Sequence, residues 1–407
     1  MLLTLPISAK SGRFTNPVDA LFTATSATCV TGLSVYDTFM HWSYFGQGVL
    51  LVLIQCGGLG LAAFATGLTL LVRRRIGIRH LVLARESAGG SNLDVISLLR
   101  IVVAFTFAVE ALGALLLMAR FVPLYGGLGV WASVFVSVSA FCNAGFDLMS
   151  SRGGGSLMAY AGDPLVNLTI MGLIVAGGLG FLTWADFSVN RLHWRKWTFQ
   201  TRIILLMTAL LVAVPALLFF TQEPISGWQA LFQSVTTRTA GFNTMDIETL
   251  SEGSRCIMII LMLTGGAPGS TAGGIKTTTA FALFMTMVSV LRIRGDVECQ
   301  SRRIPTETVR HALAIFVMYL FLFFGASIAI GYLDRAPMID AMVEVSSALG
   351  TVGLSIGLTE KLSPLSQIML MFLMYFGRVG ALTMIYALHK RKKAVPCRLP
   401  EGRLTVG

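Results

Sequence analysis

Long and short apolar segments alternate along the chain, and their lengths predict different roles. A membrane-spanning helix needs roughly 20 apolar residues. Segments of about that length or longer occur at residues 44–72, 98–119, 164–187, 203–221, 256–291, 312–332 and 365–388. Four segments are too short to span, at residues 18–28, 130–141, 226–237 and 337–349. The pattern therefore predicts spanning helices interleaved with four re-entrant half-helices.

The four half-helices belong to an internal repeat. A glycine follows each one, at Gly32, Gly145, Gly241 and Gly353, and the aligned strings read SATCVTGL, SAFCNAGF, VTTRTAGF and SALGTVGL. A second, Gly-containing marker starts 25, 32, 24 and 24 residues later, at Gly57, Gly177, Gly265 and Gly377. Two markers at near-constant separation, four times over, indicate a repeated folded unit. Each unit consists of an outer helix, a half-helix, a loop and an inner helix.

These units predict an all-α integral membrane protein with four pseudo-symmetric repeats around one central ion pore. The repeats are expected at residues 1–80, 81–196, 197–303 and 304–407, the third with a broken inner helix and the fourth with a basic tail. The first repeat shows no outer helix before its half-helix. Met1–Pro6 resembles the end of one, so either the start lies further upstream or the chain lacks this helix.

The strings before the four glycines predict a cation pathway. Thr-x-Gly strings are poor helix formers and leave main-chain carbonyls unpaired, which hydrocarbon tolerates only where the backbone is buried in protein or lines a wet cavity. Four strings around one axis would form rings of carbonyl oxygens that replace the hydration shell of a monovalent cation. A tight turn between membrane helices is the alternative. The predicted filter consists of Thr28, Cys29, Val30, Thr31, Gly32, Cys142, Asn143, Ala144, Gly145, Thr239, Ala240, Gly241, Thr351, Val352 and Gly353.

The third inner segment contains a run of helix-breaking residues between positions 264 and 274. A kink needs only one proline or a glycine pair, so the run predicts a flexible intramembrane loop below the filter. Arg378 stands at the matching depth of the fourth inner helix, where a guanidinium would repel cations and could hydrogen-bond to loop carbonyls. The predicted gate consists of Gly265, Gly266, Gly269, Ser270, Thr271, Gly273, Gly274, Lys276 and Arg378.

Two further ionisable residues lie inside predicted membrane segments. A charged side chain inside the membrane is energetically unfavourable unless it is paired or faces a water-filled cavity. Arg238 lies at the end of the third half-helix, and Glu344 in the fourth is the carboxylate expected to pair with it behind the filter. Glu110 in the second outer helix is likewise expected to be a paired structural charge.

Composition and charge support a membrane protein and assign its sides. Charged residues make up 13% of the chain and hydrophobic residues 55%, whereas soluble domains carry about 25% charged residues. Of the 31 Lys and Arg, 21 fall in four clusters, at residues 73–100, 191–202, 292–310 and 390–403. By the positive-inside rule these connections and the C-terminus are cytoplasmic. The chain is expected in the cell membrane, in contact with lipids, and the basic charge does not indicate nucleic-acid binding.

Other classes of membrane protein fit the sequence less well. An enzyme should cluster His, Asp, Glu or Cys at membrane depth, but the five histidines lie near helix ends and the six cysteines make no metal-binding spacing. A small-solute carrier usually breaks a pair of helices at the midplane, whereas four half-helices here enter from one side. No enzymatic activity and no resident cofactor are expected.

The strings ATSATCVTGL, FCNAGF, TTRTAGFNT and LGTVGLS, together with GGAPGSTAGGIKTTT and GRVGALT, resemble segments of the Trk/Ktr/HKT superfamily of potassium transporters. The resemblance runs from Ser8 to about Lys393. The chain is more similar to the Ktr-type membrane subunit than to Trk-type subunits. It implies a pore-forming subunit that takes up K⁺, which Gly32 favours because sodium-preferring members carry serine there. It also implies a homodimer and cytosolic nucleotide-binding regulatory subunits of the RCK type. Dependence on Na⁺ or H⁺ coupling stays open.

Overall fold

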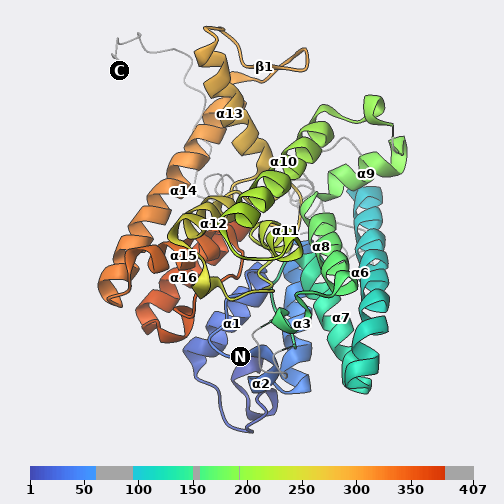
Figure 1. The fold of residues 1–407 in the computed structure, drawn as a ribbon, viewed down its shortest axis with the longest axis vertical. Helices are drawn as coiled ribbons and strands as arrows, with labels where there is room; N and C mark the ends of the chain where they lie inside the picture. Colours follow the sequence, from blue (N-terminus) through green and yellow to red (C-terminus); the bar gives the residue numbers. More distant parts are fainter. Residues whose placement is uncertain (61–94, 150–155, 192, 381–407) are drawn as a thin grey trace.

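The computed structural model describes residues 1–60, 95–149, 156–191 and 193–380, and it is almost entirely helical (Figure 1). Three outer helices are continuous: α6 (Val95–Tyr125), α10 (Phe199–Gln222) and α14 (Thr306–Leu333). Each contains an apolar stretch long enough to cross a membrane, and no more than a third of its most apolar window is buried inside the protein. The outer helices therefore present most of their surface to lipid.

Four short pore helices match the predicted half-helices closely: α1 (Pro17–Cys29), α7 (Gly127–Cys142), α11 (Gly227–Thr236) and α15 (Met338–Gly350). Two of them carry local start signals. Pro17 opens α1, where its missing N–H costs nothing, and the Asn16 side chain accepts a hydrogen bond from the Val18 N–H. Ser226 and Gln229 form a reciprocal capping box at α11. Sequence-local signals therefore explain where α1 and α11 begin.

The inner helices are α3 (Tyr44–Leu59), α8 (Pro164–Gly178) followed by α9 (Phe181–Asn190), α12 (Glu252–Leu263) followed by α13 (Thr277–Leu291), and α16 (Pro364–Val379). Two 3₁₀ turns, Leu2–Thr4 and Pro6–Ser8, precede α1, and α2 (Thr38–His41) follows it. A small hairpin of β1 (Glu298–Cys299) and β2 (Arg302–Arg303) connects α13 to α14. Four further 3₁₀ turns lie in the connections, at Met158–Tyr160, Trp194–Lys196, Ile247–Thr249 and Thr359–Lys361.

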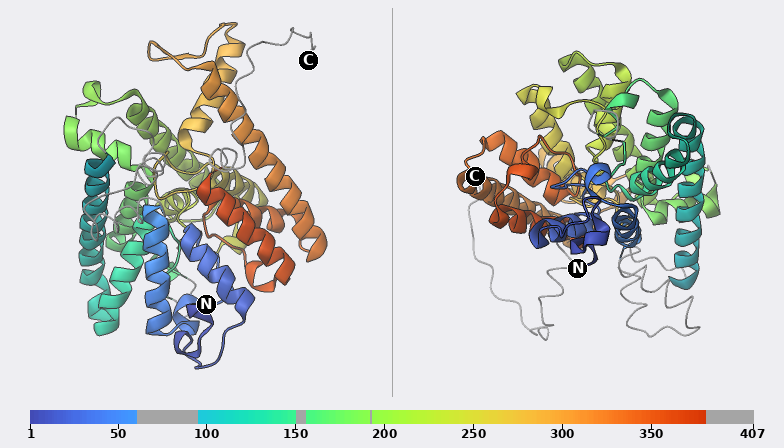
Figure 2. Two further views of the ribbon diagram at one scale, coloured as in Figure 1. Left: turned by 180° about the vertical axis from the view of Figure 1, so that it is seen from behind. Right: turned by 90° about the horizontal axis from the view of Figure 1, so that it is seen from below.

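The four repeats surround one centre in chain order (Figure 2). Inner helix α3 contacts pore helices α1 and α7, while α8 contacts α7 and α11. On the other side of the ring, α12 contacts α15, and α16 contacts both α15 and α1. The contact between α16 and α1 joins the last repeat to the first, so the arrangement closes into a ring.

The prediction of continuous inner helices at residues 44–72, 164–187 and 365–388 is wrong, because each breaks at the last glycine of its second marker. Gly60, Gly180 and Gly380 have φ of +81°, +85° and +85° with extended ψ of 130°, 145° and 140°, a conformation that essentially only glycine adopts. At Gly180 the chain turns by 94° between α8 and α9. The residues directly after 60 and 380, in the first and fourth repeats, lie outside the described ones.

The predicted break in the third inner segment is confirmed, since an irregular loop separates α12 from α13. The repeat boundaries at residues 196 and 303 fall between described helices, and the one at residue 80 lies outside the described residues. Two large apolar clusters fill the interior, one around α12, α15 and α16 and the other around α3, α7 and α8. Both converge on the loops that come after the pore helices.

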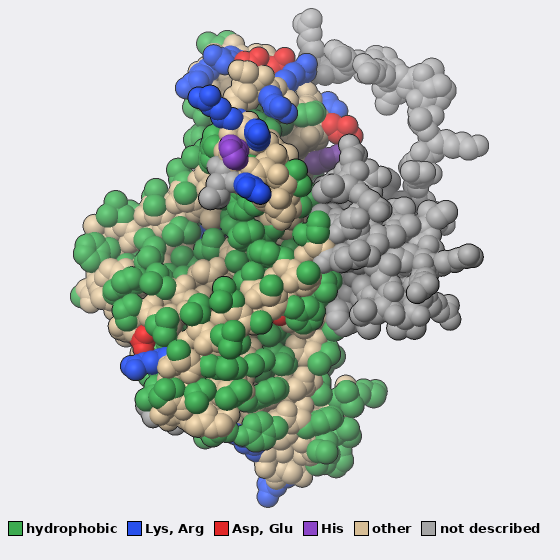
Figure 3. All heavy atoms as spheres, turned by 90° about the vertical axis from the view of Figure 1, so that its right-hand side faces the viewer, with side chains coloured by type: hydrophobic (Ala, Val, Ile, Leu, Met, Phe, Trp, Pro, Cys, Tyr) green, Lys and Arg blue, Asp and Glu red, His purple; other side chains and the backbone are tan. Residues whose placement is uncertain are grey.

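The surface divides into an apolar body and a basic end. Hydrophobic side chains cover the body, and Lys and Arg side chains gather at the end that carries the β-hairpin (Figure 3). Exposed basic residues near this end belong to two of the predicted clusters, namely Arg191, Arg195, Lys196, Arg292, Arg294, Arg302 and Arg303. An apolar body with charge at its end is the distribution expected of a membrane protein.

Candidate ion pathway at the centre of the four repeats

The strings after the four pore helices share one backbone conformation. The residue two positions before each glycine is left-handed, with φ of 57°, 59°, 69° and 53° at Val30, Asn143, Thr239 and Thr351. The glycines themselves have φ of 97°, 71°, 82° and 97° at Gly32, Gly145, Gly241 and Gly353. Left-handed conformations at β-branched residues are unfavourable and persist only where the surroundings enforce them. The same left-handed conformation recurs in all four repeats, at three β-branched residues and at Asn143.

Main-chain hydrogen bonds enforce this conformation. The N–H before each glycine donates to a carbonyl in the last turn of the pore helix. The four bonds are Thr31 to Ser26 at 2.8 Å, Ala144 to Ser139 at 2.8 Å, Ala240 to Thr236 at 3.0 Å and Val352 to Ser347 at 2.8 Å. In the first and fourth repeats the glycine N–H also donates to the serine hydroxyl at 3.0 Å. The N–H groups are therefore occupied on the helix side.

The four glycines form a closed ring. A Cβ built on Gly32 would lie 2.6 Å from the carbonyl oxygen of Ala144, and one on Gly145 would lie 2.9 Å from that of Ala240. In the same way Gly241 faces the carbonyl oxygen of Val352, and Gly353 faces that of Thr31. Each glycine thus lies against the carbonyl group of the residue that precedes the glycine of the next repeat. The glycine of the fourth repeat lies against the carbonyl group of the first repeat, which closes the ring. A side chain at any of the four positions would collide with main chain, which explains why all four are glycine.

The second marker supplies the support behind three of the strings. The last carbonyl of a pore-helix turn lies against the first glycine of the inner-helix marker: Thr28 against Gly57, Phe141 against Gly177, and Leu349 against Gly377. Each carbonyl belongs to the residue four positions before its filter glycine. Any side chain at these marker glycines would displace the string. In the third repeat Gly265 instead lies against Gly273 of its own loop.

The loop between α12 and α13 is bonded to the broken inner helix of the second repeat. The Ala267 N–H donates to the Gly178 carbonyl at 3.0 Å, and the Thr271 N–H donates to the Gly177 carbonyl at 3.2 Å. The Thr271 hydroxyl also donates to the Phe141 carbonyl at 3.2 Å, in the last turn of α7. The loop therefore crosses from its own repeat to the centre of the ring.

Arg378 holds the same loop from the opposite side. Its guanidinium donates to the carbonyls of Thr271 and Gly57, and to that of Gly58 at 3.1 Å. The ammonium group of Lys276 donates to the Ala272 carbonyl at 2.7 Å. Both basic side chains thus bind loop carbonyls, and Arg378 joins the fourth, third and first repeats.

Comparison with known proteins decides the family. The family model TrkH, described as cation transport protein, matches residues 2–394. The chain belongs to the TrkH family. It is therefore a transport protein rather than an enzyme, as the sequence predicted. The resemblance to the Trk/Ktr superfamily is confirmed.

Relatives of this TrkH-family chain match it nearly end to end. Ktr system potassium uptake protein B of Bacillus subtilis (strain 168) is 36% identical, over 100% of this chain and 93% of the relative. The protein of that name from Vibrio alginolyticus is 37% identical, over 100% and 91%. Potassium/sodium uptake protein NtpJ of Enterococcus hirae is 36% identical, over 95% and 88%. The crystal structure of the potassium transporter TrkH from Vibrio parahaemolyticus has the same fold, with a TM-score of 0.73 at 18% identity, over 92% of this chain and 79% of that chain.

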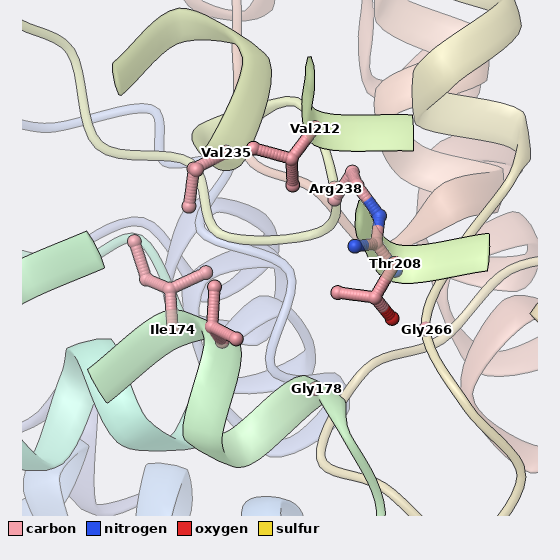
Figure 4. Close-up of a pocket in the computed structure, with 8 residues that line it drawn as sticks. Ile174, Gly178, Thr208, Val212, Val235, Arg238 and Gly266 are labelled. Atoms are coloured by element: carbon pink, nitrogen blue, oxygen red, sulfur yellow. The ribbon is translucent and has the colours of Figure 1, made fainter. Parts of the chain in front are cut away.

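The expected ion pair between Arg238 and Glu344 is wrong for this TrkH-family chain. Both oxygens of the buried Glu344 carboxylate accept hydrogen bonds, from the hydroxyls of Ser355 and Thr359. Arg238 instead points toward Thr208 on α10 (Figure 4). Within the described residues, Arg238 has no salt-bridge partner. The sequence places both residues in pore-helix segments but does not reveal the orientation of their side chains.

The expected charged partner of Glu110 is not among the described residues. Among the described residues its carboxylate contacts two neutral groups, the Gln55 amide at 3.1 Å and the Cys142 thiol at 3.8 Å. The Glu110 carbonyl accepts a hydrogen bond from the Ser137 hydroxyl at 2.7 Å. Among the described residues, Glu110 therefore supports the second string through neutral polar neighbours.

Sequence reasoning missed two serines that shape the centre, and one contact between residues that it had assigned to the filter. Ser26 and Ser347 accept hydrogen bonds from the N–H groups of Gly32 and Gly353, and their signal was a serine six positions before the glycine. Asn143 and Thr239 hydrogen-bond at 3.2 Å and join the second and third strings. No sequence signal pointed to this pair. Within the described ranges no group of three or more His, Cys, Asp or Glu is arranged to hold a metal ion.

Proposed function

We propose that this chain is the pore-forming subunit of a potassium uptake system, which moves K⁺ across the cell membrane through a filter of main-chain carbonyls. The cyclic order of the four glycines carries the proposal. Each string occupies its N–H groups on the pore-helix side, which leaves carbonyls of the same string free to act as cation ligands. Relatives that match nearly the whole chain are named as potassium uptake proteins.

The filter in this proposal comprises the residues that sequence analysis assigned around Gly32, Gly145, Gly241 and Gly353. Carbonyl oxygens replace the hydration shell of K⁺. They stabilise less well an ion that they cannot surround closely. Because the four strings differ in sequence, the ring has only approximate fourfold symmetry. We therefore expect weaker discrimination against Na⁺ than in a fourfold-symmetric channel.

The gate in this proposal is the loop between α12 and α13 together with Arg378. Hydrogen bonds from Arg378 fix the loop across the axis in the closed form. A guanidinium there also repels K⁺: two like charges 4 Å apart interact by about 4 kcal/mol at an effective dielectric of about 20. Opening requires the loop to release its bonds to Gly177 and Gly178, which its glycine content makes easier.

The partners in this proposal are a second copy of the chain and cytosolic nucleotide-binding subunits of the RCK type. Support comes from the basic end that carries the β-hairpin, and from relatives whose names assign them to a Ktr system. We place this end and the C-terminus in the cytoplasm by the positive-inside rule. A regulatory subunit bound at this end would act on the gate through α13, which continues directly from the loop.

A second candidate is a system that also uses Na⁺, either as a transported or as a coupled ion. The observation that favours it is the relative named potassium/sodium uptake protein. Rb⁺ uptake into proteoliposomes, measured with and without a Na⁺ gradient, tests both candidates. The primary proposal predicts Rb⁺ uptake that does not require Na⁺, and uptake only with Na⁺ favours the second. Absence of Rb⁺ uptake under either condition would contradict both.

A further inference from the structure

A small cavity lies at the junction of the second and third repeats. Its volume is about 10 Å³, room for a single water-sized ligand. Helices α8, α10 and α11 and the loop after α12 enclose it (Figure 4). The residues that matter for its chemistry are Gly178, Thr208, Val212, Val235, Arg238 and Gly266.

Arg238 is the charged group of this cavity, and it lacks acceptors. Its side chain is aimed into the cavity and the residue is only 7% exposed, and its Nε has no hydrogen-bond partner among the described residues. The Gly178 and Gly266 carbonyls already accept hydrogen bonds from Ala267 and Thr277. Apart from the Thr208 hydroxyl, the side chains that line the cavity around Arg238 are apolar. A buried guanidinium without an acceptor is strongly unfavourable.

No carboxylate in the described ranges balances the charge around the cavity. Lys276 and Arg378 bind loop carbonyls nearby, and within the described part of the chain neither forms a salt bridge. The same holds for Arg238, while Glu344 is bonded to Ser355 and Thr359. A water molecule would supply an acceptor but no charge. A small anion would supply both.

We propose that this cavity binds one monatomic anion of the halide class, with the Arg238 guanidinium as its ligand. The anion balances Arg238 next to the third filter string and to Gly266, where the gate loop begins. It thereby stabilises the contact between the second and third repeats. Binding at this site does not depend on the proposed K⁺ transport, so the two can fail separately.

Thermal unfolding of the purified full chain in detergent tests the proposal, with potassium chloride compared with potassium gluconate at equal ionic strength. A ligand that binds only the folded state raises the unfolding midpoint with its concentration. We expect the midpoint of the parent chain to rise with the logarithm of chloride concentration. Arg238→Met should abolish this rise. The matched control Arg255→Met should keep it, because Arg255 is bonded to Asp340 at 3.4 Å and lies outside the cavity.

Equal midpoints of the parent chain in chloride and gluconate would overturn the proposal, and so would a chloride effect that persists in Arg238→Met. If Arg238→Met does not fold, crystals of the parent chain grown in bromide decide the question. An anomalous peak in the cavity supports the anion, and its absence at saturating bromide means that the cavity holds only water.

Discussion

Arg378 donates a hydrogen bond to the main-chain carbonyl of Thr271, although the two residues are 107 positions apart in the sequence. The same guanidinium reaches the carbonyls of Gly57 and Gly58 in the first repeat. One side chain therefore ties three repeats together below the glycine ring. This contact combines a positive charge with a fixed loop, and the proposed gate rests on it.

Removing this contact should speed transport without changing ion preference. Arg378→Ala, or deletion of Gly269–Gly273, should raise Rb⁺ uptake at least about fivefold, because each removes a charge or a backbone barrier from the path. Rb⁺ influx into proteoliposomes at equal protein content measures the effect. Arg202→Ala is the matched control, since Arg202 also donates to main-chain carbonyls, those of Trp197 and Arg195, outside the ring. Uptake no faster than that of the control would locate the gate elsewhere.

The bend at Gly180 should be sensitive to a single methyl group. Gly180 has φ of +85°, and a Cβ there would lie 2.8 Å from the Pro268 carbonyl oxygen in the loop. Gly180→Ala should therefore lower the unfolding free energy by about 1–3 kcal/mol. Gly172→Ala is the control, because a Cβ at Gly172 on α8 meets nothing within 4 Å. Thermal unfolding of both variants in detergent makes the comparison, and equal midpoints would show that the bend tolerates an L-residue.

Glu344 should stabilise the fourth string through its hydrogen bonds rather than through its charge. Glu344→Leu leaves the Ser355 and Thr359 hydroxyls without their acceptor and should cost about 1–3 kcal/mol of stability. Glu344→Gln keeps one acceptor oxygen and should cost less. Asp340→Asn on the same helix is the control, since its pair with Arg255 is partly exposed. A Glu344→Gln variant as unstable as Glu344→Leu would show that the charge itself matters.

A cytosolic partner should bind the basic end of the molecule. Pull-down of the chain from its native membrane should recover a nucleotide-binding protein. Reversing the charge of Arg302 and Arg303 on the hairpin should reduce that recovery without reducing membrane abundance. Regulated Rb⁺ flux from the purified chain alone, with no partner added, would count against this prediction.

Much of the architecture could be predicted because it depends on local signals. The half-helices were short apolar runs that ended in glycine, and the broken third inner segment was rich in helix-breaking residues. Resemblance added the family, which the TrkH match confirms.

Other features depend on three-dimensional placement that a linear pattern does not contain. Gly-Gly-Leu-Gly fits a helix-packing face as well as a helix end, so the breaks at Gly60 and Gly180 were missed. The choice depends on the φ of one glycine, and at Gly180 the loop after α12 packs against that glycine. Opposite charge alone suggested the pair of Arg238 and Glu344. In the structure, the hydroxyls of Ser355 and Thr359 occupy the Glu344 carboxylate instead. The filter and gate assignments stay predictions that transport measurements must test.

The K⁺ to Na⁺ permeability ratio of Gly32→Ser, obtained from reversal potentials in planar bilayers, tests the central claim most directly. A side chain at Gly32 would begin 2.6 Å from the Ala144 carbonyl oxygen, whereas a Cβ at Gly48 on α3 meets nothing within 4 Å. The account predicts that Gly32→Ser lowers the ratio by about tenfold, as loss of one well-placed interaction of about 1.4 kcal/mol would, while Gly48→Ser leaves it unchanged. An unchanged ratio in Gly32→Ser, at equal membrane abundance, would contradict a filter built from these four strings.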